Sequence, residues 1–249
     1  MSVASVKPDQ SDTVQYLLRI ADSCLILGQR LGQWCGHAPI LEEDLALANM
    51  ALDLIGQARG VLTLTGQRSG GLDEDQLAFL RDEREYRNPT FFELPRGDFA
   101  FTVMRNLMAS TWMHLLWQRL QSSSDSELAA IAGKAVKEAR YHQEHAADWA
   151  VRLGDGTPES SQRLNTALLS LWPYVNELFE ADAIDAAATA SKLGASWADL
   201  KTDWTAQMSE VLDEAGLALP IDSAYRSYGK YGRHSEHMGH LLAEMQYLQ

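Results

Sequence analysis

Apolar residues recur at steps of three and four along most of the chain, which is the period of an amphipathic helix. The first such stretch can be capped by Asp9 or Ser11 and runs to about Trp34, before Gly36 and Pro39. We therefore expect a first long helix that buries one face, formed by Val14, Leu17, Leu18, Ala21, Leu25 and Leu31.

A second helix is predicted from Glu42 to about Thr65. Its first turn contains three acidic residues, which suit the positive end of the helix dipole. We expect its buried stripe to consist of Leu41, Leu45, Ala48, Leu52, Ile55 and Leu62.

Residues 66–98 form a long connection that glycine and proline punctuate, with a short helical turn expected over 73–84. A crossover of this length is typical of ferritin-like bundles and unusual in a simple up-and-down bundle. Asp98 can cap a third helix that continues through Leu116. The capping box Ser124–Glu127 then begins a fourth helix, and Gly154 follows the end of that helix.

The last third of the chain keeps the helical period. Thr157 followed by Pro158 predicts the start of a fifth helix, in which Pro173 predicts a kink. Further helices are expected over 196–214 and from Ser235 onward.

No segment has the alternation of a strand. The pattern predicts an all-α protein, a ferritin-like four-helix bundle with additional helices. We expect one domain over residues 1–249, with residues 1–10 as a flexible tail.

Charge and composition reduce the number of possible partners and sites. The 249 residues include 34 acidic and 21 basic side chains, a net charge of −13 that disfavours nucleic acid and anionic membranes as partners. Cys24 and Cys35 are too few for a disulfide framework or a cysteine-based zinc site. The N-terminal residues lack a signal-peptide apolar region and no run of about 18 apolar residues occurs, so we expect a cytoplasmic protein.

The most telling motif is an incomplete metal site. Two-metal oxidases built on helical bundles use a glutamate and a histidine three residues apart, which places both on one helical face. Glu138 has Tyr141 at the histidine position, and none of the seven histidines has an acidic residue three positions upstream. The chain therefore has the pattern of an oxidase bundle that lacks its metal.

Four residues remain as candidates for a degenerate metal site, and no catalytic or cofactor-binding residue is predicted. Asp22, Asp44 and Glu138 lie near the predicted inward faces, and His142 shares a face with Glu138. Buried carboxylates need a partner, so they either bind a metal weakly or form a network of ion pairs and hydrogen bonds. The missing histidine spacing favours the network.

A second candidate is the histidine series His234, His237 and His240, which lies along one side of the final helix. These side chains could bind zinc or nickel adventitiously, or act as surface and interface hydrogen-bonding groups. The arrangement is less convergent than that of a catalytic zinc site, which favours the second interpretation.

Several long segments resemble one protein family, the C subunits of the bacterial ring-1,2-phenylacetyl-CoA epoxidases. The similarity extends from about Tyr16 to the C-terminus. It is carried by segments 27–39, 43–49, 52–59, 81–84, 135–142 and 237–249.

The resemblance implies a ferritin-like subunit of a multicomponent monooxygenase. In that family a homologous catalytic subunit carries the di-iron centre. A small bridging subunit and a reductase that contains FAD and an iron–sulfur cluster complete the system. It therefore implies a structural subunit with no cofactor of its own, whose partners are these proteins and not nucleic acid or membrane. Candidate interface anchors are Trp34, Trp112, Trp117, Trp172, Tyr225, Tyr228 and Tyr231.

Two alternatives remain open at the level of sequence. The chain could be an independent ferritin-like oxidase that uses Asp22, Asp44, Glu138 and His142 as unconventional ligands. It could also be a helical module that binds an acyl-CoA, with Arg226, Lys230 and Arg233 near the phosphates.

Overall fold

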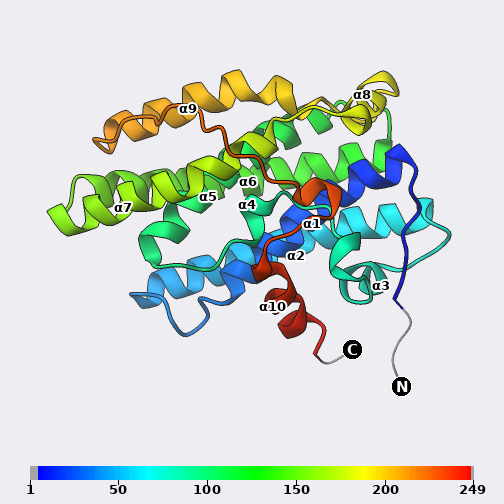
Figure 1. The fold of residues 1–249 in the computed structure, drawn as a ribbon, viewed down its shortest axis with the longest axis horizontal. Helices are drawn as coiled ribbons and strands as arrows, with labels where there is room; N and C mark the ends of the chain where they lie inside the picture. The colour runs from blue at the N-terminus through cyan, green and yellow to red at the C-terminus, as the bar shows by residue number, and fades with distance from the viewer. Residues whose placement is uncertain (1–4, 248–249) are drawn as a thin grey trace.

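The computed structural model describes residues 5–247, and every regular element within this range is a helix (Figure 1). Two helical hairpins dominate. The first joins α1 (Asp12–Gly32) to α2 (Leu41–Arg68), and the second joins α5 (Phe99–Leu120) to α6 (Ser126–Gly154). The hairpins contact each other through α2 and α6. The all-α prediction is confirmed.

Shorter helices surround these hairpins. The connection after α2 contains α3 (Glu74–Phe79), the 3-10 turn η1 (Glu83–Glu85) and α4 (Thr90–Glu93). Helices α7 (Pro158–Leu171) and α9 (Lys201–Glu214) pack on α5, α8 (Ala183–Ala190) packs on α1, and α10 (Glu236–Met245) lies beside α4 and η1 (Figure 1).

Capping chemistry explains several of these boundaries. The Asp98 carboxylate accepts a hydrogen bond from the Phe101 amide and begins α5, as predicted. Thr157 begins α7 through a reciprocal capping box with Ser160. The predicted box at Ser124–Glu127 is wrong in detail, because Asp125 is the cap and accepts from two backbone amides of the first turn.

The predicted kink at Pro173 takes a specific form. The helix does not bend and continue; it ends at Leu171 and tightens into the 3-10 segment η2 (Trp172–Leu178). Proline removes the amide donor that an α-helix needs at this position, so the tighter geometry follows. Helix α8, for which no pattern was identified, follows this segment.

The buried face of α2 differs from the prediction. Leu62 is buried, but Leu41, Leu45 and Leu52 are 70%, 58% and 66% exposed. Helix α2 carries two apolar stripes, and the other one packs into the core: Leu47, Met50, Ala51, Leu54, Ala58 and Val61. The period identified a helix correctly, but it could not show which stripe faces inward.

The chain preceding α1 is attached to the connection after α2. The Val6 amide donates to the Leu80 carbonyl at 2.8 Å, and the Asp9 amide donates to the Ser69 hydroxyl at 2.7 Å. Of the predicted flexible tail, residues 1–4 lie outside the described residues, so this observation concerns residues 5–10 alone.

Candidate functional site

The four long helices meet at a buried hydrogen-bonded cluster. Each helix contributes one side chain: Cys24 from α1, Gln57 from α2, Trp117 from α5 and Glu138 from α6. The Gln57 amide oxygen accepts from the Trp117 indole at 3.2 Å and from the Cys24 thiol at 3.7 Å. Its amide nitrogen donates to Glu138 at 3.0 Å. A glutamine therefore occupies the centre of the bundle and uses both ends of its amide.

Glu138 is only partly directed into this cluster. One carboxylate oxygen accepts from Gln57, whereas the other pairs with Lys134 one turn earlier at 3.3 Å. Its side chain is 18% exposed. A single half-paired carboxylate, an amide, an indole and a thiol do not match the carboxylate and imidazole set that two metal ions require.

Asp22 lies in a separate buried ion pair. Both of its oxygens accept from the Arg81 guanidinium, one of them at 3.0 Å, and the Arg87 amide donates at 2.8 Å. The side chains of Asp22 and Arg81 are fully buried. Of the two interpretations that the sequence left open for Asp22, this geometry favours the network.

Asp44 and His142 are also engaged elsewhere. Asp44 lies half-buried in the first turn of α2 and accepts from the Gly36 amide at 2.7 Å. The His142 ring bonds Asp53 at 3.0 Å. No hydrogen bond or ion pair joins any two of Asp22, Asp44, Glu138 and His142, although all four are described.

Histidine–carboxylate pairs connect α6 to α2. His142 pairs with Asp53, and His145 pairs with Glu43 at 3.1 Å. Burial lowers the pKa of His142, and this effect outweighs its bond to Asp53, so the ring is neutral near pH 7. Within residues 5–247, no group of three or more histidine, cysteine or acidic side chains is arranged to hold a metal ion.

A buried pair that the sequence analysis missed lies where α10 meets α4. The His234 ring bonds the Glu93 carboxylate at 2.6 Å and the Tyr86 carbonyl at 3.1 Å, and both charged side chains are fully buried. Burial opposes a charge on His234, but the hydrogen bond and charge of Glu93 outweigh it and raise the pKa of His234. With oxygen acceptors at both ring nitrogens, this ring favours the imidazolium form.

His234 therefore has a different role from the two other histidines of its series. His237 is partly exposed and His240 is exposed. One indirect signal in the sequence pointed to a buried partner for His234, since Glu93 is the single polar residue in the stretch Phe91–Leu94.

The aromatic interface candidates separate into two groups. The four tryptophans, Trp34, Trp112, Trp117 and Trp172, are buried in the chain's own core, which is one of the two roles that the sequence left open for them. Tyr225, Tyr228 and Tyr231 are 48%, 43% and 45% exposed. Large aromatic rings fill a core as well as an interface, which is why spacing did not distinguish them.

The predicted basic cluster is also divided by the fold. Lys230 is buried, where it pairs with Asp185 at 3.9 Å and donates to the Glu180 carbonyl at 2.5 Å. Arg226 donates to carbonyls of its own loop, whereas Arg233 is exposed and reaches a cavity beside α10. The three side chains therefore do not form one phosphate site.

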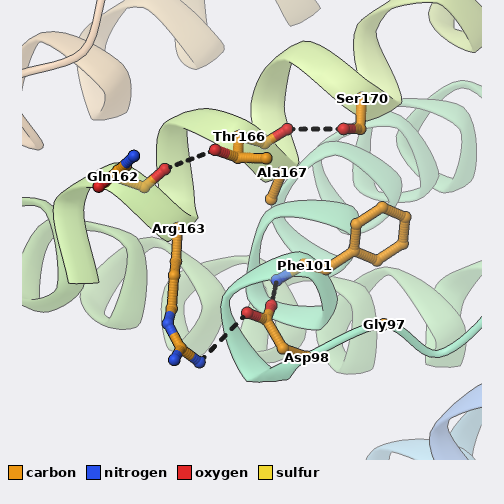
Figure 2. A pocket seen from close by; sticks show the side chains of 8 residues that line it. All are labelled: Gly97, Asp98, Phe101, Gln162, Arg163, Thr166, Ala167 and Ser170. Carbon is orange, nitrogen blue, oxygen red and sulfur yellow. Dashed lines mark hydrogen bonds and ion pairs between the residues drawn. The ribbon is translucent and has the colours of Figure 1, made fainter. Parts of the chain in front are cut away.

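A further cavity of about 430 Å³ lies between the start of α5 and α7 (Figure 2). Its arginine, Arg163, is already paired with Asp98 at 3.6 Å and with Glu159 at 2.6 Å. The hydroxyls of Thr166 and Ser170 donate to carbonyls of their own helix. The cavity therefore presents few unpaired polar groups to a ligand. No helix within residues 5–247 is long and apolar enough to cross a lipid bilayer.

Comparison with known proteins gives two findings. The family model described as "Phenylacetic acid catabolic protein" matches residues 3–249. The chain is also similar to the C subunit of the 1,2-phenylacetyl-CoA epoxidase of Escherichia coli (strain K12). The identity is 49% over 234 residues, which cover 94% of each chain.

Proposed function

Because the chain belongs to the family of phenylacetic acid catabolic proteins, we propose that it is a structural, non-catalytic subunit of a phenylacetyl-CoA epoxidase. In this proposal the chain has the ferritin-like fold and supports a homologous subunit that carries the di-iron centre. A small bridging subunit and a reductase with FAD and an iron–sulfur cluster complete the assembly. The cofactors then belong to the partners and none to this chain.

The observation that carries the proposal is the exposed stripe on α2. Leu41, Leu45 and Leu52 are each more than half exposed, and Ile40 beside them is 48% exposed. Steps of four and seven residues place the leucines on one face of the helix. An apolar helix face that the chain itself leaves uncovered suits packing against a helix of another subunit.

The interior of the bundle supports the non-catalytic part. The four long helices direct an amide, an indole, a thiol and one carboxylate toward each other at Gln57, Trp117, Cys24 and Glu138. Two irons need several carboxylates and two imidazoles in that place. The His142 ring is hydrogen-bonded to Asp53 instead.

The test replaces two exposed leucines by glutamate. Full burial of a leucine contributes about 1.5–3 kcal/mol, so covering these two side chains, each more than half exposed, contributes about 2–4 kcal/mol to association. Leu45→Glu/Leu52→Glu should therefore weaken co-purification with the catalytic subunit by about 30-fold or more. Thermal stability of the isolated chain should change little, because both side chains are exposed.

Leu169→Glu is the matched control, since Leu169 is 54% exposed but lies on α7. It should leave the complex intact. The interface is misassigned if the double variant co-purifies like the unaltered chain. The non-catalytic role fails separately if the purified chain contains about two irons.

A further inference from the structure

A cavity of about 540 Å³ lies between the turn before α10 and the connection after α2. One wall is η1 and contributes Glu83 and Arg84; the other contributes residues 231–234. These two segments are far apart in sequence. Gly232 allows them to meet, because it has φ +72° and a side chain there would overlap the Arg84 carbonyl oxygen.

The walls of the cavity are held by buried contacts. His234 is bonded to Glu93 and to the Tyr86 carbonyl. The Arg233 amide donates to the Tyr228 carbonyl at 3.1 Å, and the Gly232 amide donates to the Gly229 carbonyl at 2.9 Å. The cavity is therefore formed before any ligand arrives, which reduces the cost of ordering on binding.

The cavity has two arginines that no carboxylate neutralises. Arg84 and Arg233 are exposed, and neither side chain makes an ion pair or a hydrogen bond with a described residue. Arg87, behind Arg84, donates to oxygens of Arg84, Tyr86 and Gln15 and to no carboxylate. Such unpaired positive charge contrasts with Arg163, which pairs with Asp98 in Figure 2 and also with Glu159.

Two tyrosines and one carboxylate also lie at or beside the cavity. Burial and nearby Asp182 raise the pKa of Tyr231 to about 12, so its hydroxyl stays protonated near pH 7 and adds no negative charge to the cavity. The exposed ring of Tyr228 lies beside Arg233, whose guanidinium carbon is 5.9 Å from the ring centre. One carboxylate, Glu83, also lines the cavity and lies toward Gly239 of α10.

We propose that this cavity binds the phosphate group of a small phosphorylated ligand, with Arg84 and Arg233 on opposite walls as its two cationic contacts. Guanidinium groups match phosphate oxygens in geometry and charge, and two of them suit a doubly charged group. The exposed ring of Tyr228, beside Arg233, offers a flat surface for a base attached to such a group. The inference is independent of the scaffold role, because the cavity and the α2 stripe share no residue.

The experiment is calorimetry on the full chain with three probes: inorganic pyrophosphate, adenosine 3′,5′-bisphosphate and coenzyme A. We expect binding that weakens as sodium chloride is raised. Arg84→Gln and Arg233→Gln should each weaken it about 10-fold, which corresponds to the loss of a charged hydrogen bond. If coenzyme A or the bisphosphate binds more tightly than pyrophosphate, the ligand is a nucleotide. If all three bind equally, the site recognises the phosphate group alone.

Arg226→Gln is the matched control, because it removes the same charge from the same segment but does not line the cavity. It should leave the affinity unchanged. The inference is overturned if no probe binds, or if the control variant weakens binding as much as the two cavity variants. Thermal unfolding of each variant checks that the exposed substitutions preserve the fold.

Discussion

The effect on stability of removing the ion pair between Asp22 and Arg81 can be predicted in detail. Both side chains are fully buried. Arg81 also donates to the Leu77 carbonyl at 2.5 Å and to the Glu85 carbonyl at 2.9 Å, and its guanidinium lies 4.1 Å from the ring centre of Tyr86. The pair therefore connects α1 to the connection after α2.

Arg81→Met removes the charge and retains most of the volume. Asp22 then keeps one donor, the Arg87 amide, for a carboxylate that water cannot reach. Leaving such a charge unpaired costs about 3–5 kcal/mol. That is a large part of the about 5–15 kcal/mol by which a protein of this kind is stable.

Urea denaturation at pH 7 measures this cost directly. Arg119→Met is the control: Arg119 pairs with Asp203 at 3.2 Å, but both side chains are half exposed, so the cost should be about 1 kcal/mol or less. The double variant Asp22→Leu/Arg81→Met should lose less stability than the sum of its single variants, by about 2 kcal/mol. The reasoning is refuted if Arg81→Met costs no more than the control, or if the single effects simply add.

Three further predictions concern other parts of the molecule. His234 adds stability that is complete below pH 6.5 and is lost as the pH rises through its raised pKa; His142, with a lowered pKa, acts in the opposite direction. His234→Asn should therefore reduce the fall in melting temperature between pH 6 and pH 9, and an unchanged fall would argue against a charged His234. Gly66→Ala should destabilise by about 2 kcal/mol, because the new methyl group overlaps the Leu72 carbonyl, whereas Gly133→Ala, with open space around it, should stabilise α6 by about 0.5–1 kcal/mol. Calorimetric melting that gave both variants the same sign would contradict this packing. Glu138→Ala should leave turnover of the reconstituted oxygenase intact, and lost turnover with normal complex formation would support a catalytic site in this chain.

Local chemistry made much of the helical framework predictable. The three-and-four residue period and the Asp98 and Thr157 caps depend on neighbours within one turn. Helix α8 was harder to predict, because a short element made mostly of alanine lacks a strong hydrophobic period. Proline at position 173 predicted an interruption but not its geometry.

The sequence predicted that the candidate site lacks a histidine ligand, but it did not predict which side chains meet there. The spacing of Glu138 and Tyr141 alone indicated that a histidine ligand is missing. It could not show that Gln57 and Trp117 fill the interior, because residues 60 positions apart meet only when the hairpins pack.

What the sequence determined by itself is the long helices, the caps at Asp98 and Thr157 and the missing carboxylate–histidine spacing, since each depends on residues within about four positions. Only the tertiary structure decided which stripe of α2 faces outward, that Arg81 neutralises Asp22, and that Arg84 and Arg233 share one cavity. The physical reason is that burial and charge pairing depend on which distant segments pack together. A helical period is the same on the covered and the uncovered face of a helix.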